Sequence, residues 1–271
     1  MKLILNTWTA LLVCLFLAVP ALQAGELVLK GSTTVLPIAQ KVAEAFMKEK
    51  PDVKISLSGG GSGNGIKAII DGTAHIGNAS RFIKQKEVNL ATSKGVYPIP
   101  FRIALDAIVP VVHPSNTVTN LSLVQLREIY LGKIRDWKEV GGPKGRIVVI
   151  SRDSSSGTFG VWKDMVMLKD RVIPSALTVP SNGAIVQAVS KTPGAIGYIG
   201  LGYMNEGIKP LTVNGIEGTE ETTLNGTFPI ARGLFMFTSG WPEGDIMDFI
   251  AYIMSEKGQA LVEEAGSIRS F

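Results

Sequence analysis

The stretch Ile150-Ser151-Arg152-Asp153-Ser154-Ser155-Ser156-Gly157-Thr158 joins a predicted strand to a predicted helix. The first amides of a helix have no partners inside the helix and carry the positive end of its dipole. The hydroxyls of Ser156 and Thr158 add hydrogen-bond donors beside these amides, and Arg152 adds a bidentate fork. Because every one of these groups donates, the stretch predicts an oxyanion site at the junction of a strand and a helix.

Short apolar runs alternate with helical patterns along the rest of the chain, and no internal repeat interrupts them. This alternation is typical of an α/β protein with a parallel sheet. The periodicity predicts strands at 27–30, 53–57, 75–78, 107–112, 146–151 and 234–238, and helices at about 38–48, after 63, and at 123–130, 158–168, 184–190, 245–254 and 258–264.

A second donor-rich segment, residues 31–37, reads Gly-Ser-Thr-Thr-Val-Leu-Pro and again lies between a predicted strand and a predicted helix. Pro37 suits the first turn of that helix. The hydroxyls of Thr33 and Thr34 either cap the helix or bind a ligand, and the two roles are compatible.

Glycines dominate the third segment, residues 58–65, which reads Ser-Gly-Gly-Gly-Ser-Gly-Asn-Gly and contains Ser62. So many glycines let backbone amides approach a ligand closely. The Gly-Lys-Ser/Thr of a P-loop is missing, and Asn64 occupies the position of the third glycine of a dinucleotide fingerprint, which argues against nucleotide binding. A fourth segment, residues 77–81, offers the hydroxyl of Ser80 and the charge of Arg81.

These four segments follow four predicted strands. In open α/β sheets, ligands bind outside the carboxyl ends of the strands, so the segments are expected to converge on one cleft between two lobes. Residues 98–105 and 224–232 can each carry the chain from one lobe to the other. The expected domains are lobe 1, residues 25–104 plus 229–271, and lobe 2, residues 105–228.

The N-terminus predicts export. Residues 1–24 have the features of a signal peptide, namely Lys2, an apolar run and a small-residue exit at Ala24, and Val13 before Cys14 argues against a lipoprotein site. Removing these 24 of the 271 residues leaves 247 without a cysteine, so the exported chain must be stabilised by its core. Its formal charge of +3, after loss of Lys2 from a total of +4, is too small for a nucleic-acid partner.

Enzymatic readings have little support. The mature chain contains only His75 and His113 as histidines, and neither lies in the Gly-x-Ser-x-Gly turn of a serine hydrolase. No cluster of Asp, Glu and His suggests a metal-dependent phosphatase. We therefore expect no catalytic residue, no metal and no cofactor, although an exported phosphatase stays open as an alternative.

The four segments in this order resemble the periplasmic phosphate-binding proteins of high-affinity phosphate ABC transporters, which have the two-lobed type II solute-binding fold. The resemblance covers residues 25–271 and includes three further landmarks, at residues 120–142, 193–198 and 256–259. It implies an exported, periplasmic, monomeric protein that captures inorganic phosphate and delivers it to a membrane-embedded ABC transporter permease. It also implies a phosphate site made of Thr33, Thr34, Ser62, Ser80, Arg152, Ser156, Gly157 and Thr158.

One departure from the family pattern concerns the ligand. Some members carry, after the Gly-Ala-Ser turn, an aspartate that accepts a proton from hydrogen phosphate, whereas Arg81 follows Ser80 here. We expect Ser80 to occupy that place, and the preference between phosphate protonation states to be weaker or reversed. Sulfate, molybdate and tungstate remain alternative ligands, against which Arg152 argues because a neutral cage suffices for a fully ionised anion.

Overall fold

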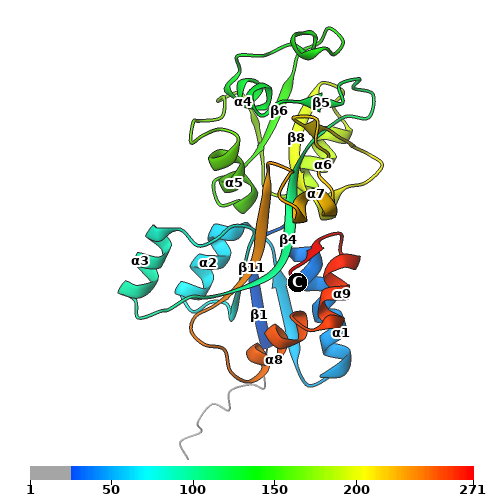
Figure 1. The fold of residues 1–271 in the computed structure, drawn as a ribbon. Helices are drawn as coiled ribbons and strands as arrows, with labels where there is room; N and C mark the ends of the chain where they lie inside the picture. The colour runs from blue at the N-terminus through cyan, green and yellow to red at the C-terminus, as the bar shows by residue number, and fades with distance from the viewer. Residues whose placement is uncertain (1–25) are drawn as a thin grey trace, which may run out of the picture.

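The computed structural model describes residues 26–271, so the expected signal peptide at residues 1–24 lies outside the described part. The elements form two lobes, one above the other in Figure 1. The strands are β1 (Glu26–Gly31), β2 (Lys54–Ser58), β3 (Ile76–Ala79), β4 (Ile99–Val112), β5 (Asn120–Leu121), β6 (Val148–Arg152), β7 (Leu177–Val179), β8 (Ala195–Gly200), β9 (Lys209–Pro210), β10 (Thr212–Val213), β11 (Ala231–Thr238) and β12 (Ile268–Arg269). The α-helices are α1 (Leu36–Glu49), α2 (Ser62–Ile70), α3 (Gln85–Ser93), α4 (Leu123–Leu131), α5 (Gly157–Met165), α6 (Asn182–Ser190), α7 (Glu220–Leu224), α8 (Gly244–Ile253) and α9 (Glu256–Glu264), and the 3₁₀ helices are η1 (Trp137–Val140) and η2 (Leu201–Tyr203).

A single mixed sheet runs through both lobes in the order β2-β1-β3-β11-β4-β8-β6-β7. Strands β1, β2 and β3 are parallel to one another, as are β6, β7 and β8. Between these two parallel sets, β11 and β4 pair antiparallel with each other and with their neighbours. The predicted parallel arrangement therefore holds inside each lobe, and antiparallel strands connect the lobes (Figure 1).

Strand β4 is longer than the sequence predicts. Periodicity indicates a strand only at 107–112, whereas the structure extends it back to Ile99. Pro100, Arg102 and Asp106 interrupt the apolar pattern of residues 99–106, which is why this half reads as a connector. Its first half pairs with β11 and β12, and its second half pairs with β8 and β9.

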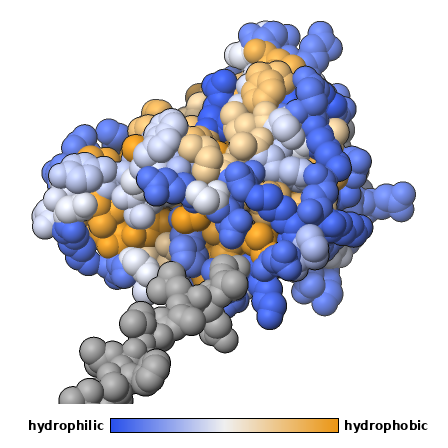
Figure 2. All heavy atoms as spheres, turned by 90° about the horizontal axis from the view of Figure 1, so that it is seen from below, coloured by the Kyte–Doolittle hydropathy of each residue, from blue (hydrophilic) through white to orange (hydrophobic). Residues whose placement is uncertain are grey.

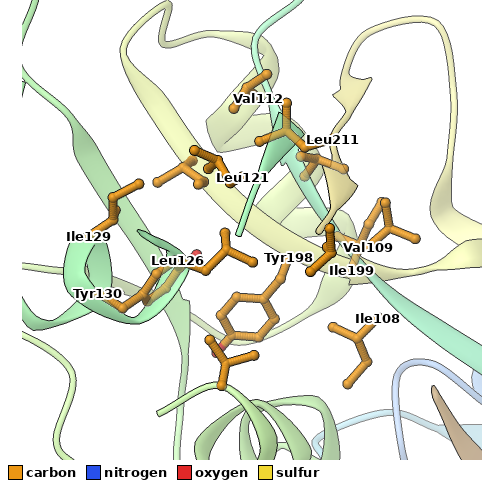
Figure 3. Packing of buried hydrophobic residues seen from close by; sticks show 14 of the residues in the cluster. Ile108, Val109, Val112, Leu121, Leu126, Ile129, Tyr130, Tyr198, Ile199 and Leu211 are labelled. Atoms are coloured by element: carbon orange, nitrogen blue, oxygen red, sulfur yellow. The ribbon is translucent and has the colours of Figure 1, made fainter. Parts of the chain in front are cut away.

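Lobe 2 has its own hydrophobic core, with buried residues that run in sequence from Ala107 to Ile230. Side chains from α4, β4 and β8 converge around Tyr198 (Figure 3). The ring of Tyr198 stacks on Trp162 of α5 at 4.2 Å between centroids. Because full burial of each large apolar side chain contributes about 1.5–3 kcal/mol, this cluster can hold α4 and α5 against the sheet.

Lobe 1 contains two further clusters, which combine residues from both ends of the described chain. One joins β1 and α1 to Phe249 and Val262 of the C-terminal helices, and the other joins α2 to Phe237 of β11. Helix α1 buries Ile38, Ala39, Val42, Ala43 and Phe46 on one face, which is the spacing expected of an amphipathic helix. The chain therefore returns to lobe 1 after leaving lobe 2.

Strand β8 and helix α3 are among the elements that lie outside the predicted strand and helix ranges. Strand β8 is buried at every position, and its glycines weaken the strand signal in the sequence. Gly197 is needed there, because a Cβ would lie 2.6 Å from Ile185 of α6. Helix α3 is mostly exposed, and Glu87 accepts hydrogen bonds at its start from the Lys84 amide.

The lower face of lobe 1 is largely hydrophilic, and hydrophobic residues are exposed among the hydrophilic ones (Figure 2). None of the helices in residues 26–271 is both long and apolar enough to span a membrane.

Candidate functional site

The loops after β1, β2, β3 and β6 meet where the two lobes face each other. Ser62, the first residue of α2, and Ser80, directly after β3, place their hydroxyl oxygens 3.3 Å apart. The Ser80 amide also donates to the Ser62 hydroxyl at 2.9 Å. Both side chains are almost fully buried.

Helix α5 of lobe 2 begins against this serine pair. A Cβ on Gly157 would overlap the hydroxyl of Ser62 and lie 2.5 Å from that of Ser80. Only glycine therefore fits at this position with the lobes in this arrangement. Ser156 caps the helix by accepting from the Phe159 amide at 3.2 Å. The capping considered for Thr33 and Thr34 is not seen, because α1 has no side-chain cap hydrogen bond.

Two threonines from opposite lobes are in contact beside the serines. Thr34 Oγ1, at the start of α1, lies 3.2 Å from Thr158 Oγ1, in the first turn of α5. Asn182, the first residue of α6, donates from Nδ2 to the hydroxyls of Thr33 at 3.2 Å and of Thr34 at 3.0 Å. The Thr34 amide is held by the Ser32 hydroxyl at 3.2 Å.

Backbone contacts also link the lobes. The Gly63 amide donates to the Ser155 carbonyl at 2.9 Å, and the Ser155 hydroxyl donates to the Gly60 carbonyl at 2.9 Å. Gly61 lies between them with φ of 98°, a conformation that glycine adopts readily. The glycine loop therefore packs directly on the predicted oxyanion segment.

Arg152, the last residue of β6, is buried and held by backbone oxygen atoms. Its Nε donates to the Val179 carbonyl at 3.1 Å and its Nη2 to the Pro180 carbonyl at 2.8 Å. Its Nη1 is buried and has no hydrogen-bond partner among residues 26–271. Burial lowers the pKa of the guanidinium, and the charge of Arg232 lowers it further against the opposing effect of Asp153.

A second buried arginine, Arg232 of β11, lies at the same junction. Its Nε and Nη2 donate to Asp106 Oδ2 of β4 at 2.9 and 2.7 Å, and the two residues are direct cross-strand neighbours. Its Nη1 donates to Thr158 Oγ1 at 3.0 Å, and its Nη2 lies 3.3 Å from Thr34 Oγ1. Burial lowers the pKa of Arg232, while Asp106 opposes that shift.

The structure thus brings most of the predicted site residues together. These residues either contact one another or are neighbours in the sequence: Thr33, Thr34, Ser62, Ser80, Ser156, Gly157 and Thr158. Arg152 makes no hydrogen bond to this group. Its charge nevertheless acts on Arg232 and Tyr203, and the Tyr203 hydroxyl donates to the Thr33 carbonyl at 2.5 Å.

Arg81 does not play the part that its position in the fourth segment suggested. Both of its terminal nitrogens donate to the carboxylate of Glu87, at 2.8 and 2.6 Å. The reason is that Glu87 also caps α3 and lies within reach of the arginine. The charge of Arg81 is therefore used inside lobe 1.

Comparisons with known proteins identify the family of this chain. A profile of the PBP superfamily domain matches residues 18–257. The chain is 32% identical over 248 residues to the phosphate-binding protein PstS of Borreliella burgdorferi, covering 87% of each chain, and 30% identical to PstS of Bacillus subtilis, covering 90% of this chain and 81% of the relative. The chain belongs to the PstS family of phosphate-binding proteins.

Solved structures support the membership in the PstS family and its α/β fold. A Clostridium perfringens structure with bound phosphate, assigned as a phosphate ABC transporter substrate-binding protein, has a TM-score of 0.86, 34% identity and coverage of 91% of this chain and 100% of that one. An ABC-type phosphate transport receptor from Vibrio cholerae has a TM-score of 0.74 at 29% identity, covering 90% of this chain and 99% of that one. The family resemblance inferred from the four segments is therefore confirmed.

The PstS family consists of binding proteins, so the expectation of a non-enzymatic protein is also confirmed. The two histidines lie outside the site: His75 Nδ1 accepts from the Val28 amide, and His113 pairs with Ser115. Residues 26–271 contain no group of three or more His, Cys, Asp or Glu side chains that could hold a metal ion.

Three residues at the junction were missed by sequence reasoning, namely Asp106, Asn182 and Arg232. Asp106 had a usable signal, because a single carboxylate inside an apolar strand needs a buried partner. Asn182 follows a serine that caps α6, which is an ordinary helix start in the sequence. Nothing local distinguishes it from a structural residue.

Proposed function

We propose that this protein captures inorganic phosphate between its lobes and delivers it to the membrane permease of an ABC transporter. The observation that carries the proposal is the buried Nη1 of Arg152, which has no hydrogen-bond partner among residues 26–271 and lies five residues before Gly157, where α5 begins and its Thr158 hydroxyl meets Thr34 of lobe 1. An anion supplies the acceptor that this nitrogen needs, and neutral donors replace the water that the anion loses. The relatives named above are phosphate-binding proteins, which supports phosphate as the ligand.

The proposed ligand contacts are Thr33, Thr34, Ser62, Ser80, Arg152, Ser156, Gly157 and Thr158. Two backbone carbonyl groups, and no carboxylate, fix Arg152. The carboxylate of Asp153 lies 3.9 Å from the guanidinium and already accepts a hydrogen bond from the Ser155 amide. Most of its positive charge is thereby left for a ligand. The starts of α2 and α5 add free amides.

The lobe boundaries proposed are residues 25–104 plus 229–271 and residues 105–228. The separate hydrophobic clusters support this division. Ile230, which these boundaries assign to lobe 1, packs in the lobe 2 cluster, and β11 begins at the next residue. The two crossings are thus strands β4 and β11, and opening of the lobes would admit phosphate.

The proposed setting is the periplasm, after cleavage of the signal peptide near Ala24, with the protein acting as a monomer. Export is supported by residues 1–24 and by the family. The apolar run before Ala24 and the absence of cysteine from residues 25–271 fit an exported chain that relies on its core.

Calorimetry on the phosphate-stripped mature protein tests the function. Titration with phosphate is expected to give tight binding with one site per chain, and sulfate, molybdate and arsenate are titrated separately. Tight binding of sulfate or molybdate instead would keep the site and change the ligand. If none of the four binds, the proposal is wrong.

A variant locates the site. Arg152→Ala is expected to weaken phosphate binding about a hundredfold, because the buried anion loses its charged donor. Arg127→Ala is the matched control, since Arg127 lies in the same lobe and pairs with Asp170 at the surface. Equal affinity in both variants would place the site elsewhere.

A further inference from the structure

The Asp106–Arg232 pair has no role in the proposed contacts, yet it is the most buried ion pair in the part of the chain that the structure describes. The side chains of Arg232 and Asp106 are 3% and 0% exposed. Burying two charges costs several kcal/mol unless their geometry and other hydrogen bonds compensate. Asp106 meets this condition, because its Oδ2 accepts two bonds from Arg232 and its Oδ1 accepts from the Leu201 amide at 2.9 Å.

The position of the pair is as informative as its burial. Arg232 and Asp106 face each other on β11 and β4, the two strands that connect the lobes. From there Arg232 donates to the Ser80 carbonyl of lobe 1 at 3.2 Å and to the Thr158 hydroxyl of lobe 2 at 3.0 Å. One guanidinium therefore contacts both halves of the candidate site.

The hydrogen-bond directions around Thr34 follow from the donor inventory. Arginine donates and never accepts, and a hydroxyl has one proton and two lone pairs. Thr34 Oγ1 accepts from Arg232 Nη2 at 3.3 Å and from Asn182 Nδ2 at 3.0 Å, which uses both lone pairs. The Thr34 hydroxyl can then act only as a donor.

The same reasoning fixes Thr158. Its oxygen accepts from Arg232 and lies 3.2 Å from Thr34, which must be the donor in that contact. Both lone pairs of Thr158 Oγ1 are then used, and its proton has no acceptor among residues 26–271. The hydroxyl is left as a donor for a ligand between the lobes.

We propose that Arg232, held by Asp106, is a positioning residue that makes the Thr34 hydroxyl donate to Thr158 and so leaves the Thr158 hydroxyl as a donor to the bound anion. This inference rests on the proposed phosphate binding. Arg152 supplies net charge, whereas Arg232 is neutralised by Asp106 and acts through the two hydroxyls. Since one hydroxyl belongs to each lobe, the pair also ties ligand contact to the closed arrangement.

The first test compares phosphate affinity in two arginine-to-lysine variants by calorimetry. Arg232→Lys keeps the charge but loses the fork that reaches Asp106, Ser80 and Thr158 together, and binding is expected to weaken about tenfold. Arg102→Lys is the matched control, because Arg102 lies on β4 and contacts Ser270. It is expected to bind as the wild type does.

A double-mutant cycle tests whether Arg232 acts through a hydroxyl. Thr158→Val alone is expected to weaken binding about tenfold. The double variant Arg232→Lys/Thr158→Val should weaken binding by much less than the roughly hundredfold product of the two single effects. A purely structural role for Arg232 predicts independent effects that multiply. Full multiplication, or unchanged affinity in Arg232→Lys, overturns the inference.

Folding and function are kept apart by two further measurements. Should Arg232→Lys fail to fold, the variant Arg232→Gln/Asp106→Asn removes both buried charges together, and at least a tenfold loss of affinity is expected. Unchanged affinity in that variant contradicts the inference. If the wild-type protein does not bind phosphate, the proposed function itself is wrong. If the wild-type protein and the Arg232 variants bind phosphate equally well, only this inference is wrong.

Discussion

Arg152 and Arg232 are both buried arginines, but different groups hold them. Two backbone carbonyls fix Arg152 at the end of β6, and a carboxylate fixes Arg232 between β4 and β11. Carbonyl groups orient a guanidinium without cancelling its charge, whereas Asp106 cancels the charge of its partner. The difference teaches that burial alone does not identify an anion-binding arginine, since the identity of its partners decides whether charge is available.

The largest effect is expected from breaking the paired arginine. Asp106→Ala leaves Arg232 as an uncompensated buried charge and should lower the free energy of unfolding by about 3–5 kcal/mol, measured by urea denaturation. Asp153→Ala is the control beside Arg152, because Asp153 is 34% exposed and 3.9 Å from the guanidinium. A loss of only about 1 kcal/mol is expected there, from the hydrogen bond that Asp153 accepts from the Ser155 amide. Equal losses in the two variants would remove the distinction between the arginines.

A second variant alters the junction without touching either arginine. Gly157→Ala adds a Cβ that would lie 2.5 Å from the Ser80 hydroxyl, so the lobes cannot approach as closely. Phosphate affinity should fall by about tenfold or more while both arginines stay in place. Gly145→Ala is the control, since a Cβ there meets nothing within 4 Å. Wild-type affinity in Gly157→Ala would mean that binding does not need this contact between lobes.

Arg81 extends the comparison to a third arginine, held by a carboxylate outside the site. Burial raises the pKa of Glu87, but hydrogen bonds from Arg81 and the Lys84 amide outweigh it, so the pKa is lowered. A lowered pKa means that the pair stabilises the fold above the carboxyl's unfolded pKa, about 4.3, and that this is lost as pH falls through the folded value.

Glu87→Gln should therefore cost about 1 kcal/mol of unfolding free energy near pH 7 and progressively less as the pH is lowered below about 4. Urea denaturation of both proteins at several pH values measures this difference. Glu263→Gln serves as control, because the Glu263–Arg269 pair is 55% and 38% exposed and contributes little. A difference that does not change with pH would show that the carboxylate charge is unimportant.

The smallest effect concerns pH and the ligand. Ser80 offers a hydroxyl where some relatives are expected to carry an acid, and both oxygens of Asp106 already accept bonds. Burial raises the pKa of Tyr198 to about 12, so it stays protonated at neutral pH. Phosphate affinity is expected to stay within about threefold, or to rise, between pH 5 and pH 8, which calorimetry at each pH measures. A steep fall across this range would require a proton acceptor that these groups do not provide.

Local chemistry explains which parts of the molecule were predictable. Thr34, Ser62 and Thr158 could be selected because each lies at a strand-to-helix junction, and parallel strands bring such junctions to one edge. The helices of lobe 1 followed from apolar periodicity in the same way. Which groups of the site contact phosphate stays a prediction.

Long-range register explains what was missed. The Asp106–Arg232 contact joins residues 126 positions apart and exists only because β4 and β11 pair in one register. Asn182 reaches Thr33 only when the two lobes meet. Strand β8 lacks a local signal because Ile185 and Val189 of α6, and not its own side chains, decide that only a small residue fits at Gly197.

Strands β4 and β11 give the connection between the lobes a mechanical character. A flexible loop resists bending hardly at all, but a hydrogen-bonded pair of strands behaves as an elastic strip with a preferred twist. The irregular register between Leu234 and Phe235 interrupts the ladder on the lobe 1 side of Arg232. If the lobes separate to admit phosphate, as proposed, this strip has to bend, and its preferred twist would favour return of the two halves to the same alignment.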